Sequence, residues 1–318
     1  MTSHAIELRG VTRRFGATTA VDDLSLTVDA GEVFGFLGHN GAGKTTTVRL
    51  LNGVLTADSG EIRVMGLDPR VQGPELRART GVLTETPSLD ERLNAVDNLT
   101  YYADLYGVPV DRVPGRVQTM LEAFGLADRA REKVGGYSKG MKQRLALGRA
   151  FLHEPEMIFL DEPTAGLDPV AAQELHQMIR HASREEGRTV FLCTHNLVEA
   201  QRLCDRVAVM EHGHLVAAGT PHQLARETGA DLRYTLEVAP GQQEAACRAA
   251  AAHPSVKGAQ VAESNGAAVI LSVTDREAVS DILVALLAAG IRLYALTPHD
   301  TSLEDIYLAL HQGSGRPS

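Results

Sequence analysis

The chain has 318 residues, which is room for about two domains, and 44% of them are hydrophobic, so a folded protein is expected. A net charge of −9, no tryptophan and 4% aromatic residues argue against a surface that wraps nucleic acid. Three cysteines without a C-x-x-C pair indicate reduced thiols. Residues 1–9 lack a leader-like apolar core, and the longest uncharged apolar stretch, 282–291, is too short to span a bilayer, so we expect a cytoplasmic chain.

Strands alternate with helices through the region 4–222, which we expect to form one domain. Helical spacing dominates from about residue 86 to 154 and predicts a helical insert there. Strands are predicted at 5–11, 24–28, 33–37, 157–160, 189–193 and 206–210, and a helix at 171–184. Strands separated by helices predict a largely parallel sheet.

The region 231–312 can be parsed independently as a small α+β domain. Strands are predicted at 232–238, 258–263, 268–273 and 292–297, and helices at 242–252 and 275–289. Asn265-Gly266 predicts a hairpin turn, and Thr301 with Glu304 predicts a capping box that opens a last helix. The order strand, helix, strand, strand, helix, strand predicts a ferredoxin-like fold.

A phosphate-binding loop is predicted between the strand 33–37 and a helix that begins near Thr45. The segment reads Gly38-His39-Asn40-Gly41-Ala42-Gly43-Lys44-Thr45, which matches G-x-x-x-x-G-K-[ST], and Thr46 is counted with it. Glycines let backbone N–H groups close around the β- and γ-phosphates, while Lys44 adds a positive charge and Thr45 offers a hydroxyl to Mg²⁺. The predicted ligands are ATP and Mg²⁺.

Two acids end the apolar strand 157–160. Because the carboxyl ends of parallel strands hold ligands in such folds, Asp161 is expected to reach Mg²⁺. Glu162 points elsewhere and can accept a proton from a water aligned on the γ-phosphorus. The alternative is a solvated strand end followed by a turn at Pro163.

The segment 137–144, Tyr-Ser-Lys-Gly-Met-Lys-Gln-Arg, precedes a predicted helix. Together with the phosphate loop and the two acids, this segment makes the sequence resemble the ATP-binding subunit of ATP-binding-cassette (ABC) transporters, whose signature motif the segment matches. The resemblance implies that Ser138 and Gly140 bind the γ-phosphate of ATP held by the opposite subunit. A helix N-terminus is a reasonable anion site, although a plain serine cap describes the same local structure.

Three further segments carry the resemblance. Ala165-Gly166-Leu167-Asp168 resembles the D-loop, which implies that Asp168 lies where the two active sites of a dimer are linked. His195, in Thr194-His195-Asn196, matches the switch histidine that contacts the γ-phosphate, although a lone histidine at a strand end is more often structural. Phe15 matches the aromatic residue that stacks on adenine, and the alternative is a core phenylalanine.

The sequence departs from the family pattern at two places. Glu85 stands where the family usually has a glutamine that senses Mg²⁺ and the attacking water. A carboxylate can still bind Mg²⁺, but it adds negative charge beside the γ-phosphate. In the signature, Lys139 and Met141 stand where glycine and glutamine are commonest, whereas Ser138 and Gly140 are kept. Phosphate binding across the dimer is therefore still expected.

The resemblance implies an α/β fold: a P-loop NTPase of the ABC cassette type, with a mixed sheet core and a helical subdomain, followed by the ferredoxin-like domain. It also implies an ATPase that forms a head-to-tail homodimer with ATP and drives a separate integral membrane permease. The signature and the ending Leu303-Glu304-Asp305-Ile306-Tyr307 look most like the drug- and polyketide-export branch that works with type-2 permeases. The subunit would then lie at the inner face of the cell membrane and bind no nucleic acid.

Two alternatives remain open to test. A soluble ABC-type ATPase that acts on nucleic acid or ribosomes is disfavoured, because the interval from Lys44 to Ser138 is too short for coiled coils or zinc modules. Each motif also occurs once, whereas ribosome-acting members hold two cassettes. The C-terminal domain could be a small-molecule sensor, but it has no obvious ligand constellation, so a dimer-stabilising role is preferred.

Overall fold

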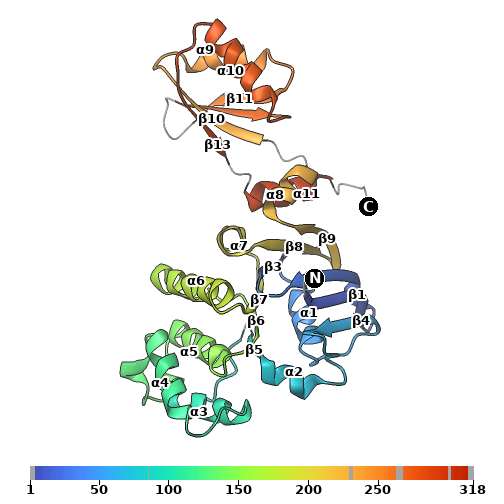
Figure 1. Ribbon diagram of the computed structural model, residues 1–318, viewed down its shortest axis with the longest axis vertical. Coiled ribbons are helices and arrows are strands. Elements are labelled where there is room, and N and C mark those ends of the chain that lie inside the picture. The colour runs from blue at the N-terminus through green and yellow to red at the C-terminus, as the bar shows by residue number, and fades with distance from the viewer. Residues whose placement is uncertain (1–3, 85, 229–231, 263–267, 300–301, 314–318) are drawn as a thin grey trace. The chain divides into compact units, whose positions relative to one another are not determined.

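A computed structural model describes residues 4–84, 86–228, 232–262, 268–299 and 302–313. The chain divides into two compact units, Met1–Gly219 and Thr220–Ser318 (Figure 1). Within the described ranges, no helix combines the length and the apolar composition that crossing a bilayer requires. The three cysteines are free, as predicted, and Cys193 and Cys204 are buried.

A six-stranded sheet forms the centre of the first unit, in the order β5-β6-β7-β3-β8-β9. Its strands are β3 (Val33–Leu37), β5 (Thr80–Leu83), β6 (Met157–Asp161), β7 (Thr189–Thr194), β8 (Arg206–Glu211) and β9 (His214–Gly219). All neighbours are parallel except β8 and β9, so the sheet is largely parallel, as predicted. Every residue of β3, β6 and β7 is buried, which explains their continuous apolar sequences.

A second, antiparallel sheet has the order β2-β1-β4. Its strands are β1 (His4–Phe15), β2 (Thr18–Asp29) and β4 (Ser59–Val64). The predicted strands at 5–11 and 24–28 are parts of the longer β1 and β2. Sequence analysis did not predict β4, because only its last residue, Val64, is buried and the strand therefore lacks apolar alternation.

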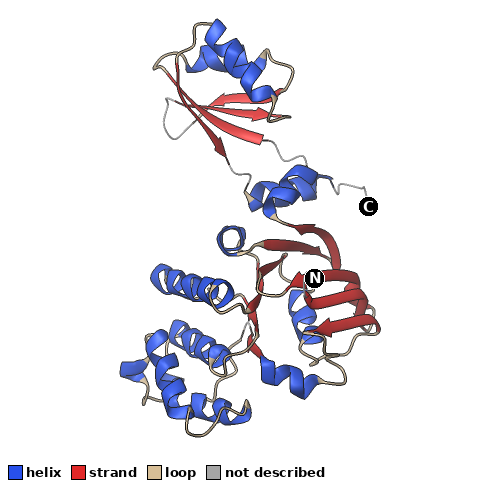
Figure 2. Ribbon diagram, viewed as in Figure 1, coloured by secondary structure: helices blue, strands red, loops and turns tan. Residues whose placement is uncertain are grey.

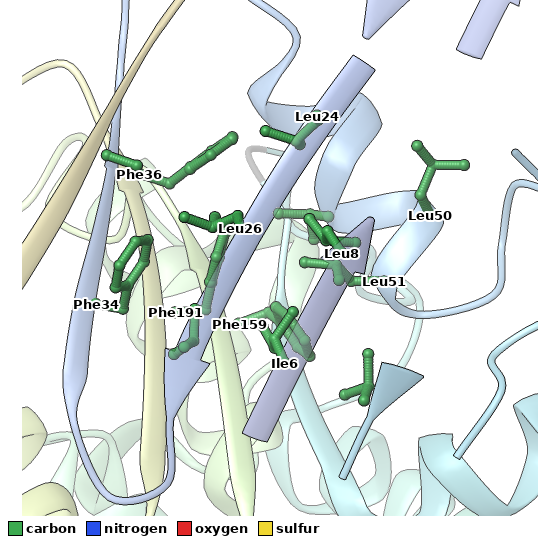
Figure 3. Packing of buried hydrophobic residues seen from close by; sticks show 14 of the residues in the cluster. Ile6, Leu8, Leu24, Leu26, Phe34, Phe36, Leu50, Leu51, Phe159 and Phe191 are labelled. Atoms are coloured by element: carbon green, nitrogen blue, oxygen red, sulfur yellow. The ribbon is translucent and has the colours of Figure 1, made fainter. Parts of the chain in front are cut away.

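The main hydrophobic core lies between these two sheets (Figure 3). Phe191 of β7 is its aromatic centre, with ring centroids 5.8 Å from Phe34, 5.2 Å from Phe36 and 5.8 Å from Phe159. The facing residues come from β1, β2 and helix α1 (Lys44–Leu51), and include Ile6, Leu8, Leu24, Leu26, Leu50 and Leu51. Burial of α1 in this core fixes the loop that precedes it.

Helices of the first unit pack beside the central sheet or against one another (Figure 2). They are α2 (Gly73–Arg79), α3 (Ala95–Leu105), α4 (Val113–Ala123), α5 (Lys139–Phe151), α6 (Pro169–Arg184) and α7 (Leu197–Leu203), with short 3₁₀ helices at Ala127–Arg129 and Val134–Gly136. Helices α3, α4 and α5 contact one another, all within the stretch predicted as a helical insert. Side chains of Asn94, Ser138, Asp168 and Asn196 cap the N-termini of α3, α5, α6 and α7.

His153, just after α5, is expected to make stability pH-dependent. Its Nε2 is 3.1 Å from Thr80 O, its ring stacks on Tyr106 at 4.0 Å, and Nδ1 is buried without a partner among the described residues. Burial, reinforced by the nearby Arg188 and Arg116, lowers the pKa of His153 to about 4. Because the unfolded chain then binds more protons between about pH 6.5 and 4, stability should fall by about 2 to 3 kcal/mol across that window as pH decreases.

The check is urea unfolding between pH 4 and 7.5, followed by a signal from the helices. His153→Gln has no ionisable group and keeps a donor for Thr80, so its unfolding free energy should fall less than that of the wild type over this window. Contributions from all other groups cancel in the difference. Equal pH slopes for the two proteins would show that His153 titrates normally in the folded state.

The second unit contains a four-stranded antiparallel sheet in the order β11-β12-β10-β13. Its elements are α8 (Pro221–Glu227), β10 (Leu232–Val238), α9 (Gln243–Ala251), β11 (Val256–Val261), β12 (Ala268–Val273), α10 (Ala278–Ala288), β13 (Leu293–His299) and α11 (Leu303–Gly313). Strand order and connections are those of a ferredoxin-like fold. The predicted turn Asn265-Gly266 lies outside the described residues, although β11 and β12 pair on either side of it.

The last helix of this unit begins at Leu303. The last helix is capped by Ser302 and Asp305, which exchange reciprocal hydrogen bonds with each other's backbone N–H groups, so the predicted pair of Thr301 and Glu304 is wrong by one residue. Thr301 itself lies outside the described residues. On α10, Ile282 and Leu286 are buried in the unit's own core, whereas Leu287 is 58% exposed.

Candidate functional site

The predicted phosphate loop, the two acids and the predicted histidine converge on one edge of the central sheet. Strands β6, β7 and β3 are neighbours and run parallel. Their carboxyl ends therefore lie side by side and lead respectively to Glu162, to His195 and to the loop that begins at Gly38. This edge is where open parallel sheets hold ligands.

The loop between β3 and α1 closes around the ammonium group of Lys44. Lys44 Nζ donates to Gly38 O at 2.6 Å and to His39 O at 3.1 Å, and the residue is only 6% exposed. Gly43 has φ +109°, and a β-carbon there would lie 2.4 Å from Ala20 O, so the tight path of the loop requires glycine. The three outer residues, His39, Asn40 and Gly41, are exposed, and Thr46 is half-buried. The loop thus presents an accessible rim over a buried positive charge.

Thr45 and Asp161 meet across the site. Thr45 Oγ1 donates to Asp161 Oδ2 at 2.9 Å, although the residues are far apart in sequence. Asp161 is the last residue of β6 and is 3% exposed. A hydroxyl and a carboxylate are the hard oxygen donors that suit Mg²⁺, which usually takes its remaining ligands from phosphates and water. The donor set at this point therefore fits that ion.

Glu162 sits on a constrained backbone directly after β6. Its φ is +50°, which is uncommon for a residue other than glycine, and its N–H donates to Cys193 O at 2.9 Å. The carboxylate atom Oε1 accepts from the N–H of His195 at 3.0 Å and lies 2.7 Å from His195 Nδ1. Oε2 lies 3.3 Å from the Thr194 hydroxyl. The structure thus brings the predicted base and the predicted histidine into direct contact.

Sequence analysis missed three polar residues near this carboxylate, of which Glu199 and Gln143 are buried and His176 is half-buried. Glu199 on α7 and His176 on α6 continue the hydrogen bonds beyond Thr194. Gln143 on α5 donates from Nε2 to Pro163 O at 3.1 Å, beside Glu162. Single polar residues on helices give no local signal of this kind, because only the packing of α5, α6 and α7 shows which of them turn inward.

The N-terminus of α5 is exposed at Ser138. Ser138 Oγ accepts from Met141 N at 3.2 Å, so the serine does cap the helix, and the predicted anion site and the plain cap coexist at one place. A β-carbon at Gly140 would lie 3.1 Å from Gly166 O, which places the start of α5 against the segment 165–168. Asp168 ends that segment, and the N–H donors of Ala171 and Val170 lower the pKa of its carboxyl group.

Two other predicted residues lie at the periphery. Phe15, at the end of β1, is 46% exposed, and the Arg13 guanidinium lies 4.7 Å from its ring centroid. The alternative that it is a core phenylalanine is therefore wrong. Glu85 lies outside the described residues.

Comparison with known proteins identifies the family. Residues 21–165 match the family described as ABC transporter. A daunorubicin resistance ATP-binding protein of Streptomyces coeruleorubidus is 38% identical over 311 residues, which cover 98% of this chain and 96% of that protein. This chain belongs to the ATP-binding proteins of ABC transporters.

Two further relatives agree with this ABC assignment. A fluoroquinolones export ATP-binding protein of Mycobacterium tuberculosis is 42% identical over 225 residues, or 70% of this chain and 73% of that protein. A solved ATP-binding subunit of an ABC transporter superposes with a TM-score of 0.67 at 31% identity, covering 71% of this chain and 93% of that one. As an ABC ATP-binding protein, the chain is an ATPase that dimerises and works with a membrane permease.

Proposed function

We propose that this subunit powers the export of drug-like, hydrophobic compounds through a separate type-2 permease. The observation that carries the proposal is similarity along nearly the whole chain, second unit included, to a daunorubicin resistance protein. A fluoroquinolones export ATP-binding protein provides further support over 70% of this chain. The chain would then work at the inner face of the cell membrane, where its permease lies.

Nucleotide binding is assigned to the edge formed by β3, β6 and β7. The N–H groups of the loop 38–46 would hold the β- and γ-phosphates, with Lys44 neutralising their charge. Thr45 and Asp161 would hold Mg²⁺, with Glu85 as a further candidate ligand, and the ion would supply charge neutralisation on the phosphates. The exposed ring of Phe15 would stack on adenine.

Glu162 is assigned as the general base. Both donors from His195 act on Oε1, so Oε2 is the atom that would take the proton from the attacking water. His195 would orient the carboxylate and contact the γ-phosphate with its ring, because its side chain is 64% exposed. Glu162 would thus act as the base and His195 as its orienting partner, and the two side chains lie within hydrogen-bond reach of each other.

The dimer would pair head to tail, so that each nucleotide lies between two subunits. Ser138 and Gly140 at the exposed N-terminus of α5 would bind the γ-phosphate held by the opposite Lys44. Asp168 would lie at the link between the two sites, because its segment packs against the start of α5. The alternative function, a soluble ATPase acting on nucleic acid or ribosomes, has no support among the relatives described.

The proposed export is tested by capturing and using the permease. Tagged Glu162→Gln chain, purified with ATP from source-cell membranes, should retain a type-2 permease. Expression of that permease with the wild-type chain should lower the cellular accumulation of daunorubicin or a fluoroquinolone, whereas expression with Lys44→Ala should not. Equal accumulation in both strains, or retention of ribosomes in place of a permease, would contradict the proposal.

We propose that the second unit stabilises the dimer. All predicted phosphate-contacting residues lie at or before His195, and α10 leaves Val284 and Leu287 exposed. A chain that ends at Gly219 should therefore bind ATP with unchanged affinity but dimerise more weakly. Calorimetry measures the ATP affinity and analytical ultracentrifugation measures the dimerisation constant, each for the truncated and the full chain. Unchanged dimerisation would favour the sensor alternative, and loss of ATP binding by a folded truncation would implicate this unit in the nucleotide site.

A further inference from the structure

A continuous set of buried and half-buried polar groups leads from helix α6 to the carboxylate of Glu162. His176 Nε2 lies 3.1 Å from Glu199 Oε1, and Glu199 Oε2 accepts from the Thr194 hydroxyl at 3.0 Å. The same hydroxyl lies 3.3 Å from Glu162 Oε2. Glu199 is 2% exposed and Thr194 is fully buried. Two carboxylates therefore share one hydroxyl group.

Helices α6 and α7 bring these groups together. Both helices pack against β7 and contact each other (Figure 1). This packing brings His176 and Glu199 to Thr194, the last residue of that strand. Glu199 N also donates to Asn196 Oδ1 at 3.1 Å, which ties the carboxylate-bearing turn of α7 to the residue after His195. A buried carboxylate is costly, and an apolar residue of similar size would often serve stability as well or better. The position of Glu199 therefore calls for a role other than packing.

The hydroxyl of Thr194 has one proton to donate. Thr194 Oγ1 already accepts from Asn196 N at 3.0 Å, and of the two carboxylate oxygens it is nearer to that of Glu199. With its proton directed to Glu199, the hydroxyl leaves the lone pairs of Glu162 Oε2 available. If Glu199 did not compete, the hydroxyl would donate to Glu162 and occupy Oε2, the oxygen proposed to take the proton from the attacking water.

We propose that Glu199, acting through the Thr194 hydroxyl, is a positioning residue for Glu162. It holds the hydroxyl proton away from Oε2 and keeps that oxygen directed to the attacking water, while His176 supplies a donor to the far oxygen of Glu199. The inference rests on the proposed role of Glu162 as the base. It adds Glu199 and Thr194, which are not among the proposed ligands of nucleotide or metal but set how well Glu162 works.

The test measures steady-state ATP hydrolysis of full-length variants. Glu199→Gln weakens the competing acceptor with almost no change in shape, and Thr194→Val removes the hydroxyl with almost no change in volume. Glu199→Gln should lower kcat about tenfold and leave KM for ATP unchanged, since groups that hold a catalytic residue in place typically matter by 10- to 100-fold. The double variant with Thr194→Val should be faster than Glu199→Gln alone, because without the hydroxyl no proton can be directed to Oε2.

Two controls separate positioning from stability. Thr194→Ser keeps the hydroxyl, so Glu199→Gln should lower kcat about tenfold in that background as well. Glu32→Gln alters a half-buried carboxylate that accepts from Asp29 N and pairs with Arg206 at the opposite end of the sheet, and it should leave kcat unchanged. Melting temperatures identify any variant that does not fold. If Glu199→Gln is one of them, Glu199→Asp carries the test with the same expected loss, because its shorter side chain moves the carboxylate away from the Thr194 hydroxyl.

The outcomes also separate this inference from the role of Glu162. Wild-type kcat in Glu199→Gln would overturn it, as would a double variant that is as slow as Glu199→Gln alone or slower, or a KM that rises by the same factor as kcat falls. If Glu162→Gln is inactive under any of these results, Glu162 remains the base and only the positioning role fails. If Glu162→Gln hydrolyses ATP normally, the proposed base itself is wrong.

Discussion

Glu162→Gln is expected to leave ATP binding intact and to lower ATP hydrolysis by about 10²- to 10⁴-fold, the usual contribution of a positioned general base. Glutamine keeps the size of the side chain and an oxygen that can accept from the His195 N–H, so the backbone turn with φ +50° and its surroundings should be preserved. It cannot take a proton from water. The loss should therefore fall on kcat and not on the affinity for ATP.

The measurement combines ATP turnover with equilibrium binding of ATP. Glu174→Gln is the matched control, because Glu174 is an exposed acid on α6 outside the site. The Glu162 variant should also accumulate as a dimer in size-exclusion chromatography with ATP, since the nucleotide that joins two subunits is no longer consumed. Turnover near that of the wild type would remove Glu162 from the proposed mechanism.

Mixing Lys44→Ala with Ser138→Arg should restore part of the activity that each variant lacks alone. Lys44 is buried inside the phosphate loop, so its removal damages the site on its own subunit. Ser138 lies at the exposed end of α5, where an arginine would obstruct the nucleotide bound to the partner. In a head-to-tail heterodimer both defects fall on one site, and the other site has an intact Lys44 and an intact Ser138.

The experiment mixes differently tagged chains and purifies the heterodimer through both tags before hydrolysis is measured. Each homodimer should lose at least about 100-fold in turnover, and the heterodimer should recover up to about half of the wild-type rate, because transition-state charge stabilisation is restored at one of two sites. The Lys44→Ala chain paired with wild type reports how well one intact site works alone. A purified heterodimer as inactive as its parents, beside an active Lys44→Ala and wild-type pair, would exclude the head-to-tail arrangement.

Much of the site could be predicted from the sequence because its motifs are local. The loop 38–45 specifies its path through glycines at set spacings, and its position between an apolar strand and a helix predicts the phosphate site. Asp161 and Glu162 follow an apolar run, so their place at a strand end could be deduced without any contact information. The ferredoxin-like order of the second unit likewise follows from alternation and helical spacing within short segments.

Tertiary structure decided the features that depend on which distant elements meet. Strand β4 is mostly exposed and carries no apolar pattern, so only its pairing with β1 defines it. Phe15 could belong to a core or a surface until the β1–β2 hairpin placed it at an exposed end. The shared hydroxyl between Glu162 and Glu199 requires β6, β7 and α7 to pack together, and the contact of Glu199 with His176 requires α6 as well. Side-chain direction on a helix is set by packing across the fold, and periodicity along the chain does not determine it for a single polar residue.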